Sequence, residues 1–194
     1  MSATMIAVIV IAVLAIAFGV FMYLQRERSR RLRGRYGPEY DRLVDHYGSA
    51  RKAEFDLVHR EKRVEAFHIR SLTPDETTRF AEAWRLEQGR FVDNPREAVA
   101  RADSLVIDLM KVKGYPMADF ERRAEDLSVD HPDVVRNYRL AHDIAQLDAR
   151  GEATTEDLRK AIVHYRALFE DLLESGTVRK VPTPVQRQKV VEHT

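Results

Sequence analysis

The sequence predicts an all-α protein in which an N-terminal transmembrane helix precedes an irregular antiparallel bundle of five to six helices. Three observations predict this class. Residues 5–24 form an unbroken apolar run, the remaining chain repeats the start and stop signals of amphipathic helices, and no segment shows the period-two alternation or the hairpin turns of a sheet. Because the expected connections are short, neighbouring helices are expected to lie antiparallel.

The apolar run at residues 5–24 is long enough for a membrane span. It contains no charged, amide or hydroxyl side chain apart from the phenol of Tyr23. A helix of this length extends about 30 Å, the thickness of the hydrocarbon core of a bilayer. A soluble core helix would carry polar residues on one of its faces. A signal peptide would have basic residues before a shorter run and a small-residue cleavage site after it, and neither flank supplies them.

The flanks of this run predict its orientation. Residues 25–35 hold six arginines and one glutamate, whereas residues 1–4 hold no basic side chain. The positive-inside rule therefore predicts a single-pass protein of the cell (inner or plasma) membrane, with a short extracytoplasmic N-terminus and a cytoplasmic C-terminal domain. A domain that faces the envelope is the alternative. Basic residues beside a bilayer also attract anionic lipid head groups. The arginines of this basic juxtamembrane segment are Arg26, Arg28, Arg30, Arg31, Arg33 and Arg35.

Residues 36–176 carry the signals of the helical bundle. Thr73 and Glu76 match the capping-box pattern, in which an N-cap threonine precedes a glutamate at the third helical position. Asn94 starts the next helix in a similar way, and Gly114 is a suitable residue to end it. The second expected helix has only a sparse apolar stripe, so we expect it to be peripheral. The expected helices span residues 38–47, 49–68, 74–91, 95–113, 117–127, 132–149 and 155–174.

Charge is distributed unevenly along the chain. Residues 36–176 contribute a net charge of −7, whereas residues 25–35 contribute +5 and residues 177–194 contribute +3, so the total of +1 is a cancellation. The prolines and isolated valines of residues 177–194 predict a disordered basic tail. The balanced total and the lack of a recognition motif argue against nucleic-acid binding. The absence of cysteine excludes disulfides, thiol nucleophiles and cysteine-ligated metals.

Four stretches of the helical region resemble an uncharacterised family of bacterial single-pass membrane, or secreted, helical proteins. The stretches are RYGPEYDRLV (35–44), RFVDNPREAVARADSLV (90–106), KGYPMADFERRAEDLSVDHPDVVRNYR (113–139) and ATTEDLRKAIVHYRALFEDLL (153–173). The resemblance implies the same organisation, a membrane segment followed by a helical domain. The family has no established activity, so the resemblance implies no catalytic residue.

Several polar residues have the composition of a catalytic site but not its spacing. The dipeptide His142-Asp143 is similar to part of the ligand set of metal-dependent HD phosphohydrolases, and Asp130 and His131 precede it. The two histidines are about 16 Å apart along a helix, a distance that one metal ion does not bridge. Asp130 is instead expected to be an N-cap, with His131 at the entrance of a helix. His164 has no serine, threonine or carboxylate placed to work with it. No metal, cofactor or enzymatic activity is therefore expected.

The turn formed by Tyr115, Pro116 and Asp119 is either a plain connection between two helices or part of a docking surface. We expect a membrane-anchored helical interaction or scaffolding protein, whose partners are the lipid bilayer and an unidentified protein. The apolar stripe of the last helix fits intramolecular packing better than a homo-oligomer, because it spans less than three heptads. The alternative function is a small-molecule or lipid-handling protein, such as an unrecognised hydrolase, with a site between bundle helices. The residues expected near that site are Tyr138, His142, His164 and Tyr165.

Overall fold

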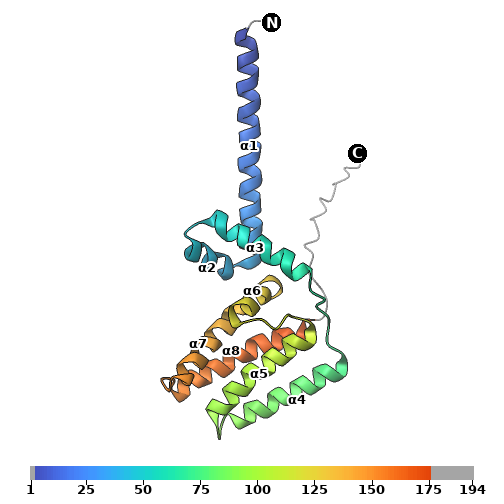
Figure 1. The fold of residues 1–194 in the computed structure, drawn as a ribbon, viewed down its shortest axis with the longest axis vertical. Helices are drawn as coiled ribbons and strands as arrows, with labels where there is room; N and C mark the ends of the chain where they lie inside the picture. The colour runs from blue at the N-terminus through green and yellow to red at the C-terminus, as the bar shows by residue number, and fades with distance from the viewer. Residues whose placement is uncertain (1–2, 176–194) are drawn as a thin grey trace, which may run out of the picture.

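The structure, a computed structural model, describes the backbone of residues 3–175 and the side chains of residues 11–175. The predicted disordered tail at residues 177–194 lies outside the described residues. Within them the chain forms eight helices and no strand, which confirms the all-α class (Figure 1). The helices are α1 (Ala3–Tyr36), α2 (Pro38–Tyr47), α3 (Ala50–Glu65), α4 (Pro74–Arg90), α5 (Pro95–Lys113), α6 (Phe120–Asp130), α7 (Val135–Ala149) and α8 (Thr155–Glu174).

Helix α1 is one unbroken helix that contains both the apolar run and the arginine-rich segment predicted from the sequence. Its N-terminal part projects from the rest of the molecule, and only its last turns contact other helices (Figure 1). In the part of the chain that the structure describes, no helix meets the length and apolarity needed to cross a membrane.

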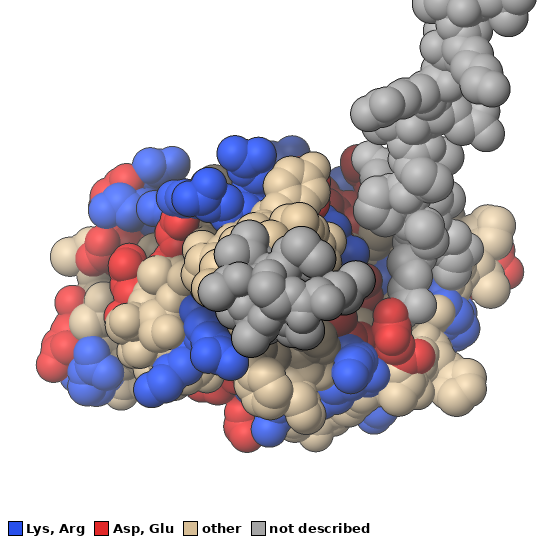
Figure 2. All heavy atoms as spheres, turned by 90° about the horizontal axis from the view of Figure 1, so that it is seen from above, with Lys and Arg blue, Asp and Glu red and all other residues tan. Residues whose placement is uncertain are grey.

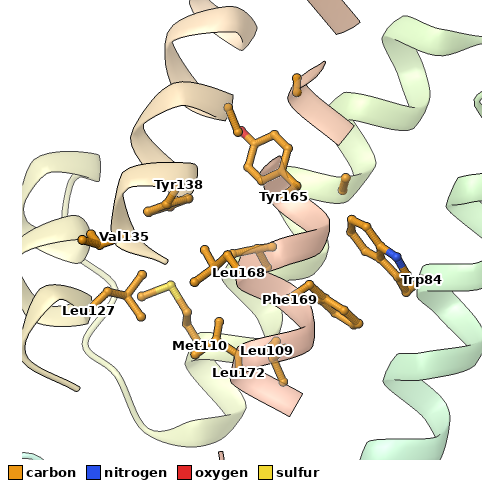
Figure 3. Packing of buried hydrophobic residues seen from close by; sticks show 14 of the residues in the cluster. Trp84, Leu109, Met110, Leu127, Val135, Tyr138, Tyr165, Leu168, Phe169 and Leu172 are labelled. Carbon is orange, nitrogen blue, oxygen red and sulfur yellow. The ribbon is translucent and has the colours of Figure 1, made fainter. Parts of the chain in front are cut away.

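Helices α4 to α8 enclose the larger of two hydrophobic cores (Figure 3). Trp84 of α4 stacks on Phe169 of α8 with ring centroids 4.6 Å apart, and Tyr138 of α7 meets Tyr165 of α8 edge to face. Helix α8 packs against both α5 and α7. Its predicted apolar stripe is therefore used within the bundle. The buried residues of that stripe are Leu158, Ala161, Tyr165, Leu168, Phe169 and Leu172.

A smaller hydrophobic core joins the end of α1 to α2 and α3. Because α2 and α3 pack on α1, the charged helix that we expected to be peripheral contributes to a second, smaller unit. We call α1 to α3 the N-terminal unit and α4 to α8 the main bundle. The buried residues of the smaller core are Leu32, Tyr36, Tyr40, Leu43, Ala53 and Leu57.

The helix caps follow the sequence signals closely. Thr73 accepts a hydrogen bond from the backbone N–H of Glu76, and the Glu76 side chain accepts one in return from the N–H of Thr73. Asn94 caps α5 through the N–H of Glu97. Gly114 ends α5 in the left-handed region at φ 97°, where a Cβ atom would lie 2.5 Å from the backbone oxygen of His68. Only glycine fits at position 114, where the chain passes close to the backbone of His68.

The structure corrects the boundaries on either side of α6. The helix expected to start at residue 117 starts at Phe120, because the side chain of Asp119 caps it by accepting from the N–H of Arg122. Asp130 was expected to cap the following helix, but it is the last residue of α6, and the N–H of His131 still bonds to the oxygen of Leu127. The next residue, Pro132, has no N–H and does not continue the helical hydrogen bonds. A turn therefore precedes α7, which starts at Val135.

Candidate functional site

The six arginines of residues 25–35 lie on exposed surface of α1. The opposite side of the same turns is not basic. Ser29 is half-buried and Leu32 and Tyr36 are fully buried against α2 and α3. This part of α1 is therefore amphipathic, with one face packed on protein and the other covered by guanidinium groups. The sequence contains a signal of this buried face, because Ser29, Leu32 and Tyr36 are spaced three and four residues apart.

Two of the six arginines are used to attach α1 to its neighbours. Arg33 pairs with Asp41 of α2 at 3.0 Å, and Arg35 pairs with Glu61 of α3 at 2.8 Å. Arg35 also donates to the backbone oxygen of Val129 in α6 at 3.4 Å. The other four, Arg26, Arg28, Arg30 and Arg31, form no ion pair within the described residues. These four are available to bind an external anion.

A cluster of buried charges joins the N-terminal unit to the main bundle. The carboxylate of Glu39, which is 4% exposed, accepts hydrogen bonds from Arg42 of α2 at 2.8 Å, Arg60 of α3 at 3.2 Å and Arg139 of α7 at 3.0 Å. Burial alone would raise the pKa of Glu39, but the hydrogen bond from Arg42 and the charges of all three arginines hold that pKa below its usual value of 4.5. Glu39 is therefore the ionised centre of this joint.

Arg60 is the matching buried cation, at 2% exposed. Besides Glu39 it contacts Asp56 at 2.7 Å, Glu125 of α6 at 3.4 Å and the hydroxyl of Ser128 at 3.4 Å. Burying charges is costly unless partners replace the lost water, and here α2, α6 and α3 itself all supply partners. The cluster therefore defines how the two units sit against each other.

A second ion pair extends this joint along α3. Arg63 donates to Asp126 at 2.8 Å and to Glu125 at 3.0 Å, and both carboxylates lie on α6. Burial raises the pKa of Asp126, and the hydrogen bond and charge of Arg63 oppose that rise. This joint was not predicted from the sequence. The available signal was the position of Arg60 in the same helical stripe as Ala53, Leu57 and Val64, where an arginine must be buried.

The turn proposed as a docking surface is largely engaged within the fold. Tyr115 is buried, and its hydroxyl lies 3.4 Å from the carboxylate of Asp130. Asp119 caps α6 by accepting from the N–H of Arg122 at 2.9 Å. Pro116 remains exposed. Two of the three predicted residues therefore have structural partners, but Asp119 is exposed as well, and a docking role of the turn remains a prediction.

The histidines singled out by the sequence serve separate local contacts. His131 is buried and pairs with Asp171 of α8. His142 stacks on Phe120, with ring centroids 3.5 Å apart. His164 contacts the amide oxygen of Asn137 at 3.0 Å, and burial lowers its pKa. Among the described residues no group of histidines, aspartates or glutamates is arranged to hold a metal ion.

The four residues of the alternative ligand site differ in burial. Tyr138 and Tyr165 are buried in the main core, while His142 and His164 lie at its border. Two open hollows on the described surface lie elsewhere, one along α1 between Phe21 and Arg30 and one along α4 between Glu82 and Asp93.

The buried amine of Lys113 closes the end of α8. It donates to the backbone oxygens of Leu172 at 2.9 Å and Ser175 at 2.8 Å. Burial lowers the pKa of this amine. A cation at the carboxyl end of a helix is favourable, because unpaired carbonyl groups gather there. Lys113 is therefore a structural cap and not a free nucleophile.

Comparison with known proteins adds no relative, since no family model, curated protein or solved structure matches this chain.

Proposed function

We propose that the protein is a single-pass membrane protein, anchored by residues 5–24, whose remaining helices form an interaction or scaffolding module at the inner face of the cell membrane. The observation that carries this proposal is the exposure of α1. Every described residue from Ile11 to Leu24 is exposed, and the large apolar ones have no protein neighbour to cover them. A helix that is apolar on all faces needs an apolar surrounding, and lipid supplies it.

The basic segment supports both the anchor and its orientation. The arginines of α1 begin two residues after Leu24, and all six are exposed although Arg33 and Arg35 also pair with α2 and α3. Arginines at this position hold the adjacent domain on the cytoplasmic side and attract anionic head groups. The four arginines without ion pairs among the described residues suit the second role.

The scaffolding part of the proposal rests on the kind of surface that the main bundle offers. Its polar residues form local caps and ion pairs. The histidines His131, His142 and His164 each make a separate local contact. Such a surface suits binding of another protein better than catalysis of a reaction.

Extraction of membranes tests the anchor. Cell membranes that contain the full chain are washed with alkaline carbonate, and we expect the protein to stay with the lipid. The variant Leu14→Arg with Phe18→Arg places two charges in the apolar run, each costing about 2.5–3.5 kcal/mol at the centre of a bilayer. This variant is expected in the wash. The matched control Val163→Arg alters an exposed residue of α8 and should stay with the membrane. Release of the unaltered protein would contradict the anchor.

Labelling of a single cysteine tests the orientation. Because the chain has no cysteine, Val163→Cys introduces one exposed thiol on α8. A maleimide that does not cross membranes should label this thiol only after the cells are broken. Labelling in intact spheroplasts would place the bundle on the envelope side.

Crosslinking in membranes tests the interaction module. We expect the full-length protein to form reproducible crosslinks to a second protein or to itself. Their absence in repeated experiments at native expression level would contradict a scaffolding role.

A further inference from the structure

Helix α3 lies across the base of α1, between the projecting part of α1 and the remaining helices (Figure 1). Helices α2 and α6 lie on the side of α3 that is remote from the N-terminus of α1, and both contact it. One side of α3 is therefore covered by protein. The other side is turned toward the end of the molecule from which α1 projects.

The two sides of α3 differ in composition. The covered side is built from Ala53, Leu57, Arg60 and Val64, which follow one another at helical spacing and are all buried. A second set of residues follows the same helical spacing on the open side. Because successive residues are 100° apart around a helix, this set lies roughly 180° from the covered one. We define the outer face of α3 by the exposed residues on this side, which are Arg51, Lys52, Phe55, His59 and Lys62; the other two exposed residues, Ala50 and Glu65, lie at the ends of the helix.

This outer face carries unpaired positive charge. Arg51, Lys52 and Lys62 form no ion pair within residues 11–175, whereas Arg60 and Arg63 on the covered side have two or more partners each. Seen along α1, lysine and arginine side chains gather close to the base of that helix, interspersed with acidic ones (Figure 2). The positive groups of α3 therefore add to those of the juxtamembrane segment.

The outer face also carries an exposed aromatic ring. Phe55 is 69% exposed, and its only ring neighbour among the described residues is His59, with centroids 5.8 Å apart. A large apolar side chain between cations is typical of helices that lie at a membrane surface, where the ring enters the acyl boundary and the cations meet phosphates.

The depth of α3 follows from its contact with α1. The hydroxyl of Ser29 donates to Glu54 of α3 at 2.5 Å. Ser29 is five residues beyond Leu24, the last residue of the apolar run, so it lies about 7.5 Å further along the helix axis. The head-group layer on each side of a bilayer is about 5–8 Å thick. If α1 spans the membrane as proposed above, α3 lies at the depth of the lipid phosphates.

We propose that the outer face of α3 docks on the surface of an anionic phospholipid bilayer. Arg51, Lys52 and Lys62 bind lipid phosphates, and Phe55 enters the boundary between head groups and acyl chains. Because the buried charges around Glu39 fix α3 to the main bundle, this contact also sets the orientation of the bundle against the membrane. The inference rests on the proposed anchor and adds a second, lipid-dependent attachment.

Fluorescence of a labelled α3 tests this docking in the full-length chain. His59→Cys is labelled with the environment-sensitive dye NBD, and the protein is inserted into nanodiscs of phosphatidylcholine alone or mixed with phosphatidylglycerol. We expect blue-shifted, brighter emission in the anionic discs, and a return toward the neutral-disc value at high salt. The same dye at Val163→Cys on α8 should report water in both lipids.

A charge variant separates docking from structural effects. Arg51→Gln, Lys52→Gln and Lys62→Gln together should remove most of the lipid-dependent shift, while the emission of Trp84 in the main core stays the same. Unchanged NBD emission between the two lipids overturns the docking, as does a shift that survives the charge variant. A blue shift that is equal in both lipids and in detergent also overturns it, because it indicates that protein covers the face.

The same samples distinguish failure of docking from failure of the anchor. A chain that does not co-purify with the discs has no membrane segment, and then both proposals fall. A chain that co-purifies and shows no lipid-dependent shift retains the anchor and loses only the docking.

Discussion

The main bundle and the N-terminal unit differ in the size of their hydrophobic cores, and the contact between the two units is made through buried charges. The described core of the main bundle contains nineteen buried apolar residues from five helices and the turn after α5, whereas that of the N-terminal unit contains six from three helices. The smaller unit is joined to the larger one through Glu39, Arg60 and their partners. Apolar burial is non-directional, while buried ion pairs demand particular partners. The comparison indicates that the main bundle supplies stability and the charged joint supplies orientation.

The largest expected effect is the loss of a core leucine from the main bundle. Leu168→Ala removes a fully buried side chain and should lower the free energy of unfolding by about 2–5 kcal/mol. The single tryptophan, Trp84, stacks on the adjacent Phe169, so its fluorescence reports unfolding of this core. The matched control Leu57→Ala creates a similar cavity in the smaller core. It should leave the Trp84 transition in place and increase hydrogen exchange in α2 and α3. Equal shifts of the Trp84 transition in both variants would show that the two units unfold as one cooperative unit.

The next effect concerns the charged joint. Glu39→Gln keeps the shape of the side chain but leaves Arg60 and Arg139 with less counter-charge. The expected cost is about 1–3 kcal/mol, seen as faster hydrogen exchange in α3 and α6. Glu170→Gln, which removes the charge of an exposed pair with Arg166, should cost less than about 0.5 kcal/mol. Equal effects of the two substitutions would show that the joint does not contribute orientation.

Acid should weaken the joint before it weakens the main core. The folded-state pKa of Glu39 is lower than its usual 4.5, so its contribution is complete above about pH 4.5 and is lost as the pH falls through the folded-state pKa. The raised pKa of Asp126 has the opposite sign and offsets part of this loss. Hydrogen exchange in α3 should therefore rise at a higher pH than the pH at which Trp84 emission changes. Simultaneous changes, or no change that depends on Glu39, would contradict the prediction.

The smallest effect is expected at the start of α4. Thr73→Ala removes the hydroxyl that accepts from Glu76 N–H and should cost about 1 kcal/mol. The control Thr78→Ala lies inside the same helix, where alanine is favoured, and should be neutral or slightly stabilising. Thermal unfolding followed by circular dichroism compares the two. A neutral Thr73→Ala would mean that the cap is not needed to position α4.

Much of the fold could be predicted from the sequence because local signals decide it. The caps at Thr73 and Asn94 and the glycine stop at Gly114 are formed as predicted. The start of α7 was misplaced because Asp130 resembles an N-cap, while the hydrogen bonding of α6 continues past it. Local patterns do not show which of two competing helices takes such a residue.

The charged joint and the division into two units could not be read from local patterns. The partners of Glu39 come from positions 3, 21 and 100 residues away in the chain, and no periodic signal connects them. The arginines of α1 were identified correctly as a basic segment. That Arg33 and Arg35 bind α2 and α3 while four others remain unpaired among the described residues depends on tertiary packing alone.

Spin-label depth measurements along α1 and α3 test whether α1 is inserted in the bilayer and α3 lies at its surface. Single cysteines replace Ile16, Glu27, His59 and Val163 in the full chain, and each carries a nitroxide in bilayers that contain phosphatidylglycerol. The account predicts high oxygen accessibility at Ile16, intermediate values at Glu27 and His59, and accessibility to an aqueous nickel reagent at Val163. Water-like values at Ile16 would contradict the membrane anchor on which the account depends.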